Sequence, residues 1–121
     1  MKVLPIFSLL KSDLAIKALL ETNGILRVFD YGIAPEGVAL PYVVFQQISG
    51  TPYNTYTCSD VAERVLVQFD VYAKTAQLAF TITSKIKEGL SHHCYFTDFR
   101  GIVKDTDGLY RSSFDCSWHL L

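Results

Sequence analysis

Apolar residues recur every three or four positions near the start of the chain, and this spacing predicts an amphipathic helix. The positions are Ile6, Leu9, Leu10, Leu14, Ala18 and Leu19. Pro5 suits the first turn of a helix, and Asn23 with Gly24 suits its end. Ser12 and Asp13 could also cap a second helix. We therefore expect helical structure over residues 6–20, either continuous or broken near residue 12.

Strand patterns follow in the middle of the chain. Residues 25–29 predict a short strand with Arg27 on the solvent side, and residues 42–48 predict a second, β-branched and aromatic strand. The Gly- and Pro-rich segment 30–41 between them predicts an ordered loop. The clearest strand has Arg64, Gln68 and Asp70 on one face. Its other face carries Val65, Val67, Phe69, Val71 and Ala73. A sheet with one face in the core is therefore expected.

A second helix and two strands complete the pattern. Thr75 is the expected N-cap, and the buried stripe comprises Leu78, Ala79, Ile82, Ile86 and Leu90. Strands are predicted at 95–103 and 109–120, joined by a turn at 105–108 in which Gly108 can take a positive φ. The expected core comprises Leu10, Leu14, Val67, Phe69, Val71, Ile82, Ile86, Phe114 and Trp118.

The predicted order of elements is α-β-β-β-α-β-β. This order favours an α+β fold, with a mainly antiparallel sheet of four to five strands and two helices packed on one face. A chain of 121 residues is the size of one domain, here residues 1–121. Half of the residues are hydrophobic and 19% are charged, against about 25% in a typical domain. This excludes a disordered chain and indicates that part of the surface is covered by something else.

Charge and cysteine content limit the possible partners and the cellular compartment of the protein. A formal net charge of −1 gives no bulk attraction to nucleic acid, so a sequence-specific DNA-binding protein is not expected. Cys58, Cys94 and Cys116 form no disulfide framework, which favours a reducing cytoplasm. The apolar N-terminal run is interrupted early by Ser8 and Lys11, unlike a signal peptide, and no run is long enough to span a membrane. We expect a soluble, intracellular protein.

His92, His93 and Cys94 are the candidate metal ligands, with Cys116 or His119 as completing residues. Neighbouring residues of an extended chain point to opposite faces, so at most two of the three adjacent side chains converge. Paired ligands at zinc spacing are absent from the sequence. The favoured interpretation is that these residues are simply the polar end of the preceding helix. A small hydrolase or metal enzyme using His92, Cys94 or His119 is the remote alternative.

Other acidic and catalytic patterns also favour a structural protein. Asp105 and Asp107 resemble the start of a calcium loop, but no acidic residue follows at the required spacing, so a turn is favoured. Asp70 and Asp115 are expected to be solvated carboxylates on a strand face. The sequence has no nucleophile elbow and no phosphate-binding loop. We therefore expect no enzyme, no cofactor and no metal.

The polar segment 49–60 is long for a hairpin connection, which usually takes two to five residues. It is either a mobile solvated loop or an arm that orders against a neighbouring protein. Tyrosine is enriched at protein interfaces. The candidate interface residues of this projecting loop are Thr51, Tyr53, Asn54, Tyr56 and Asp60.

Several segments together resemble the tail completion or tail terminator proteins of long-tailed bacteriophages and prophages. They are IFSLL at 6–10, YGIAPEG at 31–37, LPYVVF at 40–45, DVYAKT at 70–75 and DGLYRSSFDCS at 107–117. The resemblance covers essentially the whole chain and includes no catalytic motif. It rests on the order and spacing of these segments.

The resemblance implies a structural protein of the virion tail or neck, assembled in the host cytoplasm. Such proteins form a ring, usually of six subunits, that caps the tail tube and ends its polymerisation. The implied partners are other copies of the chain, the tail tube protein and a head-completion or connector protein. DNA passes through the lumen without sequence-specific binding, and no membrane is involved. A head-side connector or stopper protein of the neck is the alternative.

Overall fold

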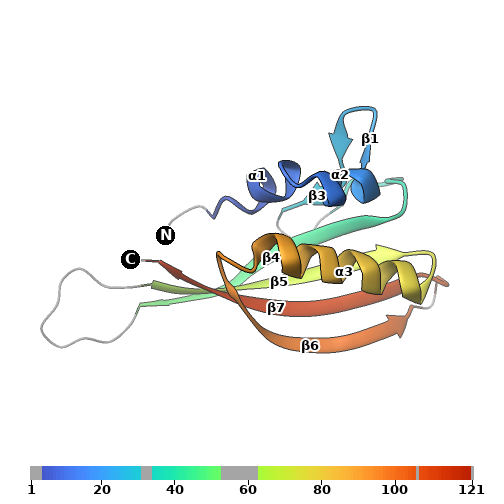
Figure 1. The fold of residues 1–121 in the computed structure, drawn as a ribbon. Helices are drawn as coiled ribbons and strands as arrows, with labels where there is room; N and C mark the ends of the chain where they lie inside the picture. The colour runs from blue at the N-terminus through green and yellow to red at the C-terminus, as the bar shows by residue number, and fades with distance from the viewer. Residues whose placement is uncertain (1–3, 31–33, 53–62, 106, 121) are drawn as a thin grey trace, which may run out of the picture.

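Three helices lie on one face of a five-stranded sheet in the computed structural model, which describes residues 4–30, 34–52, 63–105 and 107–120 (Figure 1). The helices are α1 (Ile6–Lys11), α2 (Leu14–Leu20) and α3 (Ala76–Leu90). The sheet order is β3-β4-β5-β7-β6, antiparallel except for the parallel β3–β4 pair. Its strands are β3 (Val28–Phe29), β4 (Tyr42–Pro52), β5 (Glu63–Ala73), β6 (Tyr95–Lys104) and β7 (Tyr110–Leu120). β1 (Glu21–Thr22) and β2 (Ile25–Leu26) form a separate small hairpin. The predicted α+β class is confirmed.

The N-terminal helical region is broken into α1 and α2, at the position where a cap was considered. The Asp13 side chain accepts hydrogen bonds from the backbone N–H groups of Ala15 (2.9 Å) and Ile16 (3.2 Å). Because α2 starts a new helix, its buried side differs from the one expected for a continuous helix. Ile16 is fully buried, whereas Leu14 is 80% exposed. The prediction of Leu14 in the core is therefore wrong.

Helix α3 begins as predicted at a Thr75 cap, whose hydroxyl accepts from the backbone N–H of Leu78 at 3.1 Å. Its sheet-facing side is Ala79, Ile82, Thr83, Ile86 and Leu90, all buried. The close approach of α2 explains why a glycine suits position 89 of α3. A Cβ added there would lie 2.7 Å from Oδ2 of Asp13, so glycine allows the start of α2 to approach α3 closely.

The core lies between the helices and the sheet and is centred on β5. Val65, Val67, Phe69, Val71 and Ala73 have no exposed surface, which confirms the predicted phase of this strand. The Phe69 ring stacks on Phe114 with centroids 5.0 Å apart and tilts against Phe45 at 5.8 Å. The other predicted core residues, apart from Leu14, are also buried.

One polar contact joins α3 to the sheet inside this core. The Thr83 hydroxyl donates to the carbonyl oxygen of Ala79 at 2.9 Å, and the Ser112 hydroxyl lies 2.7 Å from the same Thr83 oxygen. Thr83 has only one hydroxyl proton, so Ser112 is the donor in the second bond. Both hydroxyls are therefore satisfied although they are buried.

The connection between β4 and β5 is shorter than predicted. Residues 49–52 belong to β4 and pair with residues 63–66 of β5 after a bulge between Gln47 and Ser49. Residues 49–52, which were expected to belong to the loop, are therefore strand, and residues 53–62 lie outside the described residues. Local propensity disfavours Ser, Gly and Pro in strands, but β5 continues to pair with β7 over the same length, and this pairing supports the extended ladder.

Arg27 lies between β2 and β3 and is half-buried, whereas its neighbours Leu26 and Val28 are buried, so it does alternate away from the core but is not a freely solvated side chain. Its guanidinium donates to the carbonyl oxygens of Pro41 (2.8 Å) and Leu19 (3.3 Å) and to the Thr22 hydroxyl. The side chain thus connects α2, the β1–β2 hairpin and the start of β4, a long-range role that strand periodicity does not reveal.

Candidate functional site

The hairpin of β4 and β5 projects beyond the helical layer, with β7 alongside it (Figure 1). Thr51, one of the candidate interface residues, lies in β4 opposite Arg64 in the ladder. Tyr53, Asn54, Tyr56 and Asp60 lie outside the described residues. The described strands thus establish the base of the predicted arm, and the role of its tip stays a prediction.

The sheet face opposite the helices carries a polar network centred on Asp70. Its carboxylate accepts from the Ser113 hydroxyl at 2.5 Å and from the Gln68 amide at 3.3 Å. These bonds join β5 to β7 on the face that the helices leave uncovered. Asp70 is half-buried and hydrogen-bonded rather than the freely solvated carboxylate that was expected.

Asp115 belongs to the same face and holds Arg100 of β6. Two guanidinium nitrogens of Arg100 lie 2.8 Å from the two carboxylate oxygens of Asp115, and Asp98 lies 3.5 Å from the same guanidinium. The hydrogen bond to Asp115 raises the pKa of the Arg100 guanidinium above its ordinary value, so the ion pair stays charged. Asp115 is therefore a structural ion-pair partner that joins β6 to β7.

The three adjacent candidate metal ligands, His92, His93 and Cys94, have separate surroundings. The thiol of Cys94 is buried and hydrogen-bonds to the Leu90 carbonyl at 3.5 Å, while His92 is exposed. The His93 ring stacks on Trp118 with centroids 6.2 Å apart. Within the ranges that the structure describes, no three His, Cys, Asp or Glu side chains gather in a way that could hold a metal ion. For His119 the structure describes the backbone and not the side chain.

The structure does bring Cys94 and Cys116 together. Cys116 lies in the core, where Nε1 of Trp118 donates to its sulfur at 3.0 Å. A hydrogen bond to Cys94 and burial both raise the pKa of the Cys116 thiol far above its usual range. A thiol that keeps its proton is a poor nucleophile and a poor metal ligand, so the core location of Cys116 favours packing over chemistry.

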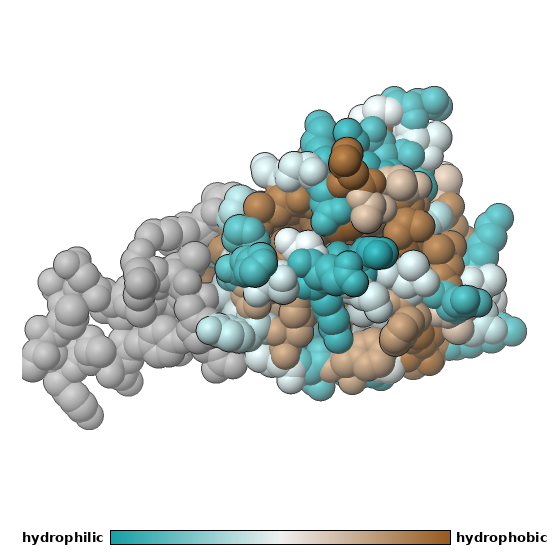
Figure 2. Space-filling model, in the orientation of Figure 1, coloured by the Kyte–Doolittle hydropathy of each residue, from teal (hydrophilic) through white to brown (hydrophobic). Residues whose placement is uncertain are grey.

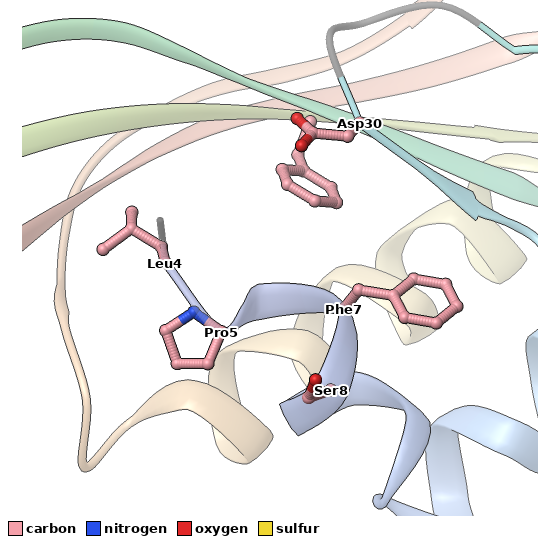
Figure 3. Close-up of a pocket in the computed structure, with 6 residues that line it drawn as sticks. Leu4, Pro5, Phe7, Ser8 and Asp30 are labelled. Atoms are coloured by element: carbon pink, nitrogen blue, oxygen red, sulfur yellow. The ribbon is translucent and has the colours of Figure 1, made fainter. Parts of the chain in front are cut away.

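A pocket of about 410 Å³ opens beside the β3–β4 edge of the sheet (Figure 3). Its walls are Leu4, Pro5, Phe7, Ser8, Asp30 and Phe45. Asp30 follows β3 and lies across the pocket from Leu4 and Pro5 (Figure 3). Phe7 is 41% exposed at this site. The pocket is mainly apolar and has one charged lining residue, which suits a hydrophobic contact with a polar anchor.

Large apolar side chains are also exposed at other places on the described surface. On the face that Figure 2 shows, brown areas lie among polar ones, including one at the lower right, where the start of α3 lies near the end of β6. The side chains are Phe7, Leu14, Ile25, Ile48, Phe80, Tyr95, Phe99 and Val103. None of the described helices is long and apolar enough to cross a bilayer.

Sequence reasoning did not single out Phe80 or Phe99, although a signal was present. Phe80 falls outside the stripe that defines the buried side of α3. An aromatic residue off the core stripe of an amphipathic helix is a mark of a second apolar surface. Phe99 lies in a strand whose bulges change its phase, and alternation alone does not reveal its exposure.

Comparison with known proteins finds one matching family and solved structures with a similar fold. A family described as "Tail completion protein gp17" matches residues 5–120. The fold is similar to a chain in "Virion of native gene transfer agent (GTA) particle", with a TM-score of 0.70 and 14% identity over 95% of this chain and 90% of that one. It is also similar to "Structure of bacteriophage SPP1 gp17 protein", with a TM-score of 0.57 and 18% identity over 96% and 86% of the two chains. No curated protein matches the sequence.

Proposed function

The chain belongs to the family of the tail completion protein gp17, and from this membership we propose that six copies form a ring that closes the end of a phage tail tube. It is a structural protein of the virion tail. The observation that carries the proposal is the extent of the family match, which runs over residues 5–120 of the 121 residues.

In the proposed role the ring ends polymerisation of the tail tube and presents a surface to a head-completion or connector protein. The protein acts by binding, without catalysis, cofactor or metal. Genomic DNA passes through the lumen without being read. A formal net charge of −1 supports this, because a strongly basic lumen would retain the phosphates of the passing DNA.

We assign the tip of the β4–β5 arm to contact with a neighbouring ring subunit or the tail tube. The arm is supported by the extension of β4, β5 and β7 beyond the helices (Figure 1). Tyr53 and Tyr56 are the proposed anchors, since each has a large apolar ring, a hydroxyl and only two χ angles to order.

Loss of the protein from a phage that encodes it tests the proposed role. Particles made without it should be unjoined heads and tails, with tails longer than normal, and the added protein should restore joining. Labelled protein should be found by electron microscopy at the head-proximal end of the tail. Tails of normal length joined to heads would overturn the proposal. Label on isolated heads would indicate a head-side connector or stopper instead.

A double variant tests the arm. Tyr53→Ser with Tyr56→Ser should leave secondary structure and melting of the monomer unchanged, because the arm adds little to the core. It should weaken ring formation or tube capping by at least about 2 kcal/mol, if either tyrosine is a binding hot spot. Ile25→Ser is the control, since Ile25 is 65% exposed on the separate β1–β2 hairpin. Normal infectious particles from the double variant would contradict the assignment.

A further inference from the structure

An exposed aromatic surface runs along one edge of the sheet, between α3 and the edge strand β6. We call it the α3–β6 seam and define it by Phe80, Lys87, Phe96, Phe99 and Ile102. Phe80 is 55% exposed and Phe99 is 42% exposed. The Lys87 ammonium lies 5.9 Å from the Phe96 ring and 5.1 Å from the Phe99 ring. The seam is therefore an apolar surface with a cation in its middle.

Register relations place Phe80 and Ile102 at the same end of the seam. Ile102 pairs with Ser112 in the ladder, and the Ser112 hydroxyl bonds to Thr83 of α3. Phe80 lies one helical turn before Thr83, on the same flank of α3 as Lys87. Figure 2 shows a brown area where the start of α3 and the end of β6 lie (lower right).

The pocket of Figure 3 lies at the opposite edge of the same sheet. Phe45 of β4 and Asp30 at the end of β3 form one side, and β3 and β4 come first in the strand order, whereas β6 comes last. Asp30 is the one charged residue among the six that line the pocket. The two edges thus differ: the seam is an exposed aromatic surface with Lys87 over its rings, and the pocket is an apolar hollow with Asp30 in its lining.

We propose that the α3–β6 seam of one subunit docks into the pocket of Figure 3 on the next copy of this chain, with Lys87 placed against Asp30 of the neighbour. Two unlike surfaces on opposite sides of a subunit give a head-to-tail contact, which closes into a ring if the rotation is right. This inference rests on the proposed function, because it assigns the surfaces by which the ring forms.

Side chains rather than backbone ladders carry the proposed contact. β6 has register shifts between Phe96 and Asp98 and between Phe99 and Ile102, and β4 has one between Gln47 and Ser49. Bulges of this kind disrupt the regular spacing of backbone groups and disfavour strand addition at a sheet edge. The exposed aromatic side chains of the seam remain available to a partner.

A charge exchange tests the predicted pair. Lys87→Glu and Asp30→Lys should each weaken self-association at least tenfold, measured by sedimentation velocity at several protein concentrations. The double variant should recover most of the wild-type affinity, because the pair is restored with its signs reversed. Leu14→Glu is the control, since Leu14 is 80% exposed and belongs to neither surface. Lack of recovery in the double variant would overturn the pairing of these two residues.

Mixing two blocked variants tests the head-to-tail geometry. Phe99→Glu blocks the seam and Phe7→Glu blocks the pocket, so each variant alone should be monomeric with unchanged circular dichroism. Their equimolar mixture has one intact seam and one intact pocket and should form complexes of two subunits and nothing larger. If the seam contacted another seam, Phe7→Glu alone would still dimerise. That result, or a wild-type protein that stays monomeric, would refute the proposal.

These outcomes separate the contact from the proposed role. Rings that form normally from Lys87→Glu and Phe99→Glu would refute the seam and leave the ring function intact. Self-association that follows the predicted pattern, in a phage whose tails are joined and of normal length without this protein, would support the contact and refute the function.

Discussion

Truncating Phe69 to alanine tests the central packing of the fold. The ring is fully buried in the middle strand and stacks on Phe114 at 5.0 Å with planes 8° apart. Replacement of a buried phenylalanine by alanine costs about 3–5 kcal/mol through lost transfer energy and the cavity left behind. For a domain of this size, a loss of that order should lower the melting temperature by about 10–20 °C.

Differential scanning calorimetry and urea unfolding, at one fixed protein concentration, measure the effect. Leu14→Ala is the matched control, and it should change the free energy of unfolding by less than about 0.5 kcal/mol because Leu14 is 80% exposed. A double-mutant cycle of Phe69 and Phe114 should show a coupling energy of at least about 0.5 kcal/mol. If Phe69→Ala melted within about 3 °C of the wild type, the assignment of Phe69 to the core centre would be refuted.

Three further predictions follow from single contacts and are checked by urea unfolding. Gly89→Ala should not give the gain of about 1 kcal/mol that alanine normally brings to a helix interior, because the new Cβ displaces the capping Asp13, whereas the gain should appear in an Asp13→Ala background; equal effects in both would contradict this reasoning. Thr83→Val should cost about 1–3 kcal/mol by leaving the buried Ser112 hydroxyl without its acceptor, and adding Ser112→Ala should recover part of the loss. The raised pKa of Cys116 means that the folded protein keeps a proton which the unfolded chain loses above its ordinary pKa of 9.0. Stability should therefore fall as pH rises above 9.0, by up to about 1.4 kcal/mol per pH unit, and Cys116→Ala should make the decline shallower.

The parts of the fold that the sequence predicted are those in which one local pattern determines one face. The alternation from Val65 to Ala73 correctly predicted the buried face of β5, because β5 lies between two long strands and has one face in the core throughout. The buried side of α3 and its Thr75 cap could also be predicted, because both depend on residues within one helical segment. The turn at Gly108 could be predicted because a tight turn needs a residue with positive φ, and Gly108 has a φ of 80°.

The parts that sequence reasoning missed depend on contacts between distant segments. The new start of α2 at Asp13 changes which side chains of this region face inward, so Ile16 is buried and Leu14 is not. The far end of β4 is a strand because β5 and β7 extend alongside it, although its own residues favour a turn. Phe99 is exposed because β6 is the last strand of the sheet, and edge position is a property of the topology rather than of the strand's sequence.

The strand order has a consequence for how the chain folds. β4 and β5 are neighbours in both sequence and space, so their hairpin can form from local contacts alone. β7 comes after every other strand in the chain and yet lies between β5 and β6. Until β7 has been synthesised and has inserted, β5 lacks one partner and β6 has no place in the sheet. Loop closure over α3 and β6 should therefore limit the folding rate, and amides of β6 should gain protection from hydrogen exchange only together with those of β7.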